Sequence, residues 1–168
     1  MKQVLLVLVV VIVVLGVGVI LFLTSNESAK DLPAVGEEFS ILGANHINVG
    51  AEHEEYNSNP PTSGSHYAQA AAWGFYDEEL PDEQLIHSLE HGGIWISYKD
   101  VDDQTKEYLN FIARKNSGSV IVTPRPENDT KISLASWGRL ENLDEFDENK
   151  INNFIRSNKN KSPEPIAN

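Results

Sequence analysis

Residues 53–98 decide the fold and read HEEYNSNPPTSGSHYAQAAAWGFYDEELPDEQLIHSLEHGGIWISY. Four of the five histidines of the chain lie in this stretch, at positions 53, 66, 87 and 91, and the chain has no cysteine. Two of the three tryptophans and the turn sequence Pro60–Gly64 also lie in this stretch. Such a concentration of imidazole groups indicates a functional site.

Start and stop signals in the second half of this stretch predict a helix of about ten residues. Pro81 suits the first helical position, and the acidic pair Asp82 and Glu83 suits the first turn. Gly92 suits the position just after the last turn. The β-branched and aromatic run 94–98 then predicts a strand.

The remaining periodic segments predict an α+β domain. We expect a short strand at 46–49, a second helix from Asp102 or Asp103 to 115, strands at 119–123 and 131–136 joined by a turn at 124–129, and a last helix at 147–156. A strand, a helix and a strand followed by a hairpin predict a small mixed sheet with packed helices.

The N-terminal segment 1–24 is predicted to be a transmembrane signal-anchor. Residues 4–23 form an uninterrupted apolar run whose length as a helix, about 30 Å, matches the hydrocarbon core of a bilayer. A cleaved signal peptide is the alternative, but its apolar region is normally shorter and ends in a small-x-small cleavage site. We then expect a tether at 25–43, an extracytoplasmic α+β domain at 44–157 and a disordered tail at 158–168.

Charge predicts the orientation of this anchor and excludes one class of partner. Lys2 precedes the apolar run, so the N-terminus is expected in the cytoplasm and the domain outside the cell membrane. The formal net charge of −12 argues against a nucleic-acid partner, which requires a basic surface. Without cysteines, the exported domain has no disulfides and depends on its core.

The phase of the predicted helix separates its apolar residues from its histidines. At about 100° per residue, Leu85, Ile86 and Leu89 lie on one side, while His87 and His91 lie together on the other. Two histidines four residues apart can bind one metal ion, and exposed histidines near a helix C-terminus are the simpler alternative.

With the two loop histidines added, the predicted ligands are His53, His66, His87 and His91, with Glu90 beside them. Imidazoles without thiolates or thioethers favour zinc or copper(II). We further expect Tyr56 and Arg139 to contact this group from outside, with Arg139 holding a carboxylate such as that of Glu90.

Two other functions remain open. Residues 87–91 fit the pattern His-x-x-Glu-His of zinc peptidases, in which Glu90 acts as general base of a metal-dependent hydrolase. That chemistry needs a third acidic ligand, for which Glu141, Glu145 or Glu148 would be candidates. In the other function, the histidines form buried hydrogen bonds within a metal-free cell-envelope interaction module.

Several strings together resemble a known family. They are His53-x-x-Tyr56, Pro60–Gly64 with His66, Gly74-x-Tyr76, His87–Gly92, Tyr98 and Trp137–Arg139. Over about residues 45–154 the chain resembles the bacterial domain of unknown function family 3105. The resemblance implies an N-terminal membrane anchor and one exported domain, and it implies no activity. It also implies that the four histidines form one constellation, and His46 carries less weight because it lies outside the strings.

Overall fold

The computed structural model describes residues 32–167, and residues 33–167 belong to one compact unit. The predicted anchor at 4–23 lies outside the described residues. Among the helices that are described, none has the length and apolarity needed to cross a membrane.

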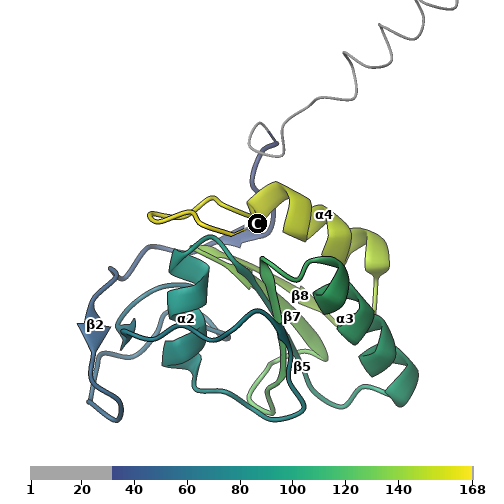
Figure 1. Ribbon diagram of the computed structural model, residues 1–168, viewed down its shortest axis with the longest axis horizontal. Coiled ribbons are helices and arrows are strands. Elements are labelled where there is room, and N and C mark those ends of the chain that lie inside the picture. Colours follow the sequence, from purple (N-terminus) through teal and green to yellow (C-terminus); the bar gives the residue numbers. More distant parts are fainter. Residues whose placement is uncertain (1–31, 168) are drawn as a thin grey trace, which may run out of the picture. The chain divides into compact units, whose positions relative to one another are not determined.

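The described chain contains a mixed sheet, a two-stranded sheet and helices, as the sequence predicts (Figure 1). The elements, in chain order, are β1 (Glu37–Glu38), β2 (His46–Ile47), β3 (His66–Tyr67), β4 (Gly74–Phe75), α2 (Asp82–Glu90), β5 (Ile94–Tyr98), α3 (Asp103–Lys115), β6 (Val120–Pro124), β7 (Ile132–Ser136), β8 (Arg139–Leu143) and α4 (Glu148–Asn158). The large sheet has the order β1-β8-β7-β5-β6-β4, and β2 pairs with β3 in the small one.

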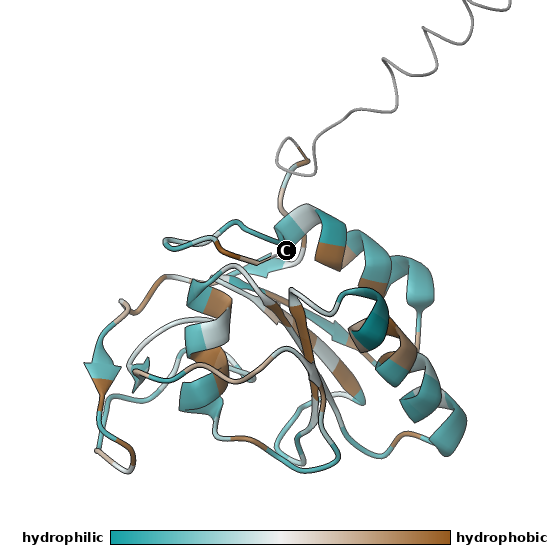
Figure 2. Ribbon diagram, in the orientation of Figure 1, coloured by the Kyte–Doolittle hydropathy of each residue, from teal (hydrophilic) through white to brown (hydrophobic). Residues whose placement is uncertain are grey.

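Helices cover both faces of the large sheet. On one face, α3 and α4 pack Leu109, Ile112 and Phe154 against the sheet, and on the other face α2 packs Leu85 and Leu89. Alternate residues of the central strand β5 pack into the two cores, because successive side chains of a strand point to opposite faces of the sheet. Figure 2 shows the apolar residues on the strands and on the helix sides that face them.

The end of α2 has the hydrogen bonds of a Schellman motif. The amide of Gly92 donates to the carbonyl of Leu89 over 2.9 Å, and the amide of Gly93 donates to that of Ser88 over 3.0 Å. Gly92 has a φ of +83°, a conformation that glycine adopts without strain. The prediction that the helix ends at Gly92 is therefore confirmed, and so is the reason for it, which is the suitability of glycine for the position after the last turn.

The predicted hairpin of strands 119–123 and 131–136 is wrong. Strand β5 lies between β6 and β7, pairing in parallel with β6 and antiparallel with β7. The crossover through α3 places β6 beside β5, and the loop after β6 then carries the chain to the opposite edge of β5. The hairpin that does form joins β7 to β8 through the turn Trp137–Gly138.

Both ends of the described chain are better ordered than their composition predicts. Within the predicted tether, β1 pairs with β8, and the backbone of Val35 exchanges two 3.1 Å hydrogen bonds with the side chain of Asn158. Within the predicted tail, residues 160–167 bond to the end of α2, and Ala167 is buried. The structure therefore differs from the predicted disordered tail, and the predicted tether contains a short strand.

The buried side of α2 gives a direct test of the fold. Leu89 is fully buried, so Leu89→Ala should lower the free energy of unfolding by about 2–5 kcal/mol, the usual cost of the cavity that remains. Phe111→Ala, at a half-exposed position of α3, is the control and should cost far less. Chemical denaturation with a chelator present measures both, and equal losses would contradict the assigned orientation of α2.

Candidate functional site

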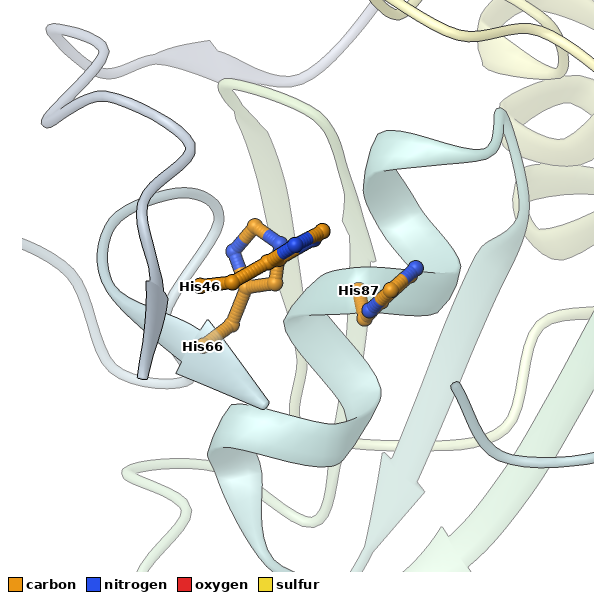
Figure 3. A group of neighbouring side chains, drawn as sticks. All are labelled: His46, His66 and His87. Atoms are coloured by element: carbon orange, nitrogen blue, oxygen red, sulfur yellow. The ribbon is translucent and has the colours of Figure 1, made fainter. Parts of the chain in front are cut away.

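Three histidines from three elements converge beside α2 (Figure 3). His46 lies in β2, His66 in β3 and His87 in the middle of α2. One ring nitrogen from each residue lies within 4.8 Å of the other two. The parallel pairing of β2 with β3 sets His46 directly opposite His66, and α2 contacts β3. This group, His46, His66 and His87, is called the histidine triad below.

Backbone carbonyl groups orient two of the triad rings. The Nδ1 atom of His66 lies 2.8 Å from the carbonyl oxygen of Gly64, and that of His87 lies 2.6 Å from the carbonyl oxygen of Tyr67. A carbonyl can only accept, so each Nδ1 carries the proton. The Nε2 atoms of neutral His66 and His87 therefore keep their lone pairs for a further partner. Histidines that bind metals are oriented by this kind of hydrogen bond.

Glu90 faces the triad with a buried carboxylate. Its Oε2 atom lies 3.1 Å from Nε2 of His66 and 3.8 Å from Nε2 of His46. Glu90 is 5% exposed and His66 is fully buried. A lone pair on Nε2 and a carboxylate oxygen cannot hydrogen-bond to each other, so this contact requires either a further proton, on His66 or on Glu90, or a cation. The donor set therefore fits a metal ion.

His91 extends the triad along α2. Its Nε2 atom lies 2.8 Å from Nε2 of His87, one helical turn away. On its other side, Nδ1 of His91 lies 3.4 Å from the carbonyl oxygen of Glu164. His87 therefore points away from the apolar core, toward β3, and His91 lies beside it, as the helix phase predicts.

Burial lowers the pKa of His87. The hydrogen bond to the carbonyl of Tyr67 opposes this effect, and positive charge on His91, His66 or His46 adds to it. A lowered pKa keeps the imidazole neutral near pH 7, which is the form that binds a metal ion.

His46 was missed by the sequence prediction, which favoured His53 as the fourth ligand. The ring of His46 stacks on that of His87 with centroids 4.9 Å apart, and its side chain is 51% exposed. The predicted strand at 46–49 was the one available signal. That signal did not reveal which strand β2 would pair with, and this pairing brings His46 to the site.

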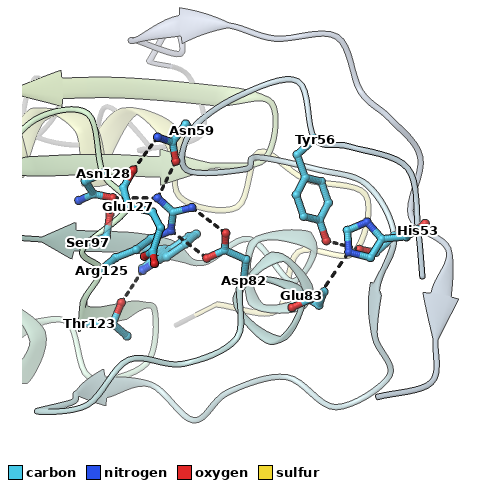
Figure 4. Close-up of polar contacts among 12 residues, drawn as sticks. His53, Tyr56, Asn59, Asp82, Glu83, Ser97, Thr123, Arg125, Glu127 and Asn128 are labelled. Atoms are coloured by element: carbon cyan, nitrogen blue, oxygen red, sulfur yellow. Dashed lines mark hydrogen bonds and ion pairs between the residues drawn. The ribbon is translucent and has the colours of Figure 1, made fainter. Parts of the chain in front are cut away.

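His53 lies apart from the triad, at the opposite end of α2 (Figure 4). Its Nε2 atom lies 3.3 Å from the carboxylate of Glu83 in the first turn, and its ring packs on Tyr56. The hydroxyl of Tyr56 donates to the carbonyl of Ser65 over 2.7 Å. Burial raises the pKa of this hydroxyl, and the charges of Glu83 and Asp82 raise it further. Tyr56 thus supports the loop that carries His66.

The other predicted neighbours lie on other elements. Arg139 pairs with Glu38 across β8 and β1 over 2.8 Å, and no contact with Glu90 is found among the described residues. Of the acidic candidates for a third peptidase ligand, Glu141 lies in β8 and Glu148 opens α4, which packs on the other face of the sheet.

The turn Pro60–Gly64 is buried and holds the loop of His66 in place. The hydroxyl of Ser63 accepts a hydrogen bond from the amide of Leu42 over 3.0 Å, and the carbonyl of Thr62 accepts one from the amide of Gly138 over 3.1 Å. Gly64 has a φ of +121°, and a side chain there would meet the ring of Tyr56 at 3.0 Å. The role of this string is therefore to position His66.

A second polar network, which the sequence prediction missed, anchors the start of α2 (Figure 4). Arg125 is 7% exposed and forms two hydrogen bonds of 2.9 and 2.8 Å to the carboxylate of Asp82. It also donates to the side chain of Asn59 over 2.6 Å, and its guanidinium lies over the ring of Trp95. Because α2 carries His87, Glu90 and His91, this network fixes their position along the sheet.

Comparison with known proteins assigns this chain to a family. No curated protein and no solved structure matches the chain. The family model described as "Protein of unknown function (DUF3105)" matches residues 48–168, which include His66 and the whole of α2 and leave out His46. Since the match covers most of the chain and includes the strings that carried the resemblance, this chain belongs to the DUF3105 family of proteins of unknown function.

Proposed function

We propose that this domain binds a metal ion through the histidine triad. The observation that carries the proposal is the convergence of one ring nitrogen each from His46, His66 and His87 within 4.8 Å. Two of these rings are already oriented by carbonyl groups, which leaves their Nε2 atoms without a proton in the neutral imidazole and suited to act as ligands. His91 and Glu90 supply a further nitrogen and a negative charge at the edge of the triad.

The donor types favour zinc or copper(II). Imidazole nitrogens and one carboxylate oxygen suit these ions, whereas copper(I) prefers sulfur ligands, and the chain contains no cysteine. A divalent cation also compensates the buried charge of Glu90, which is costly to leave without a partner.

We further propose that residues 4–23 anchor the protein in the cell membrane with the domain outside. The length and apolarity of the run and the position of Lys2 support this topology. The domain would then take up its metal ion from the extracytoplasmic space.

A metal ion that binds only the folded state should stabilise the domain. At a hundredfold excess over Kd, zinc or copper(II) is expected to add about 2.7 kcal/mol to the free energy of unfolding. Thermal unfolding with and without metal measures this gain, and a chelator should reverse it. His46→Ala, His66→Ala and His87→Ala should each remove most of the gain.

His53→Ala is the matched control, because His53 contacts Glu83 outside the triad. It should leave the metal-induced gain intact. The gain should also fade below about pH 6, because protons compete for imidazoles whose ordinary pKa is about 6.5. The lowered pKa of His87 has a separate effect: the metal-free domain itself loses stability as the pH falls, since the unfolded chain binds the proton more readily. If neither metal shifts the midpoint at neutral pH, the proposal is wrong.

Glu90→Gln separates the carboxylate's role in metal binding from its role in folding. The amide of glutamine can donate to the lone pair on Nε2 of His66. In the absence of metal, the free energy of unfolding of the variant should therefore lie within about 1 kcal/mol of that of the parent protein. Its metal-induced gain should nevertheless shrink, because the negative charge is lost. Glu83→Gln, which changes the other glutamate of α2 that faces a histidine, is the control and should retain the full gain. An undiminished gain in Glu90→Gln would exclude a role of this carboxylate in metal binding.

The proposed membrane topology can be tested separately. Protease added to intact cells or spheroplasts should digest the domain, because the anchor holds it outside the membrane. A domain that survives this treatment, or a soluble form that lacks residues 1–25, would contradict the proposed anchor.

A further inference from the structure

The C-terminal residues 159–167, called the C-terminal strap below, complete the last turn of α2. The carbonyl groups at a helix end lack partners within the helix. Here the Schellman motif occupies those of Ser88 and Leu89, and amides of the strap occupy the next three. The strap bonds, with their donor–acceptor distances, are Glu164 to Glu90 at 3.2 Å, Ile166 and Ala167 to His91 at 3.0 and 3.2 Å, and Asn160 to Gly92 at 2.9 Å.

Asn160 closes the strap on itself. Its side chain donates to the carbonyl of Ala167 over 2.7 Å and accepts from the amide of Ala167 over 3.0 Å. Asn160 also packs so closely on Gly92 that a side chain at Gly92 would meet its Oδ1 atom at 2.5 Å. The strap is therefore fitted to the end of α2, and Asn160 is the residue that holds its shape.

The strap places an oxygen atom opposite Nδ1 of His91, as two backbone carbonyl groups do for His66 and His87. Nδ1 of His66 faces the carbonyl of Gly64, and Nδ1 of His87 faces that of Tyr67. Nδ1 of His91 faces the carbonyl of Glu164 at 3.4 Å and its carboxylate at 3.7 Å. Each of the three imidazoles thus has its Nδ1 atom directed at an oxygen. The Nε2 atoms of His87 and His91 face each other, and that of His66 faces Glu90.

We infer that the C-terminal strap is part of the metal centre, in which Asn160 and Glu164 are positioning residues that hold His91 as a further ligand. This inference rests on the proposed function. By covering the end of α2, the strap also slows the departure of the ion, because His91 must turn away from its partners before the ion can leave.

The test uses the full chain loaded with cobalt(II), whose visible spectrum reports the number and type of ligands. The variants are Asn160→Gly, which keeps the left-handed backbone at φ +61° but removes both side-chain bonds, and Glu164→Gln. Each should weaken the metal affinity by about 10-fold or more, the usual effect of changing a residue that orients a ligand, and should speed the loss of metal to a competing chelator accordingly. Asn160→Gly should also give the spectrum of His91→Ala. Glu107→Gln, an exposed position on α3, is the matched control.

A double variant decides whether the strap acts through His91. Asn160→Gly combined with His91→Ala should lose metal no faster than His91→Ala alone, because both changes remove the same ligand. Additive effects, or an unchanged rate and spectrum in Asn160→Gly, would overturn the inference while leaving the triad as a metal site. Failure of the unaltered chain to bind cobalt(II), zinc or copper(II) would overturn both.

Discussion

The contact between the carboxylate of Glu90 and the imidazole of His66 is the interaction on which the site depends. Both side chains are almost completely removed from water, at a cost of several kcal/mol for an uncompensated charge. The proton on Nδ1 of His66 is directed at Gly64, so the contact with Glu90 is favourable only when a second proton or a cation is present. The positions of His46, His87 and His91 around this contact offer a cation the nitrogen ligands that it needs.

Helix α2 is the element that makes this arrangement rigid. Its first turn is held by the paired hydrogen bonds between Arg125 and Asp82, and its last turn by the Schellman motif and the C-terminal strap. Between these two anchors, Leu85 and Leu89 pack on the sheet while His87 and Glu90 face the β2–β3 layer. A site on a helix that is fixed at both ends keeps its ligands close to one geometry, which favours tight binding.

Local signals were sufficient to predict α2, β5 and the stop at Gly92, because turn chemistry and hydrophobic periodicity act over a few residues. The helical periodicity also correctly predicted that His87 and His91 lie on the side of the helix opposite its apolar residues. Local signals were not sufficient for His46, which reaches the site only because β2 pairs with β3, twenty residues away in the sequence. The ordered strap gave no signal either, since it binds α2 largely through backbone amides, which every composition provides.

The site lies outside both hydrophobic cores, and this separation explains how a chain without cysteines supports it. Apolar residues on the two faces of the large sheet supply the burial that stabilises the fold, and His66 meets the nearer cluster only at its edge, through Trp137. The unfavourable free energy of burying polar groups therefore arises in one layer, where carbonyl groups and a single carboxylate lie opposite the imidazole nitrogens. A histidine of the triad can therefore be substituted in a different layer from the one that stabilises the sheet, so the proposed metal binding and the folding of the domain can be tested separately.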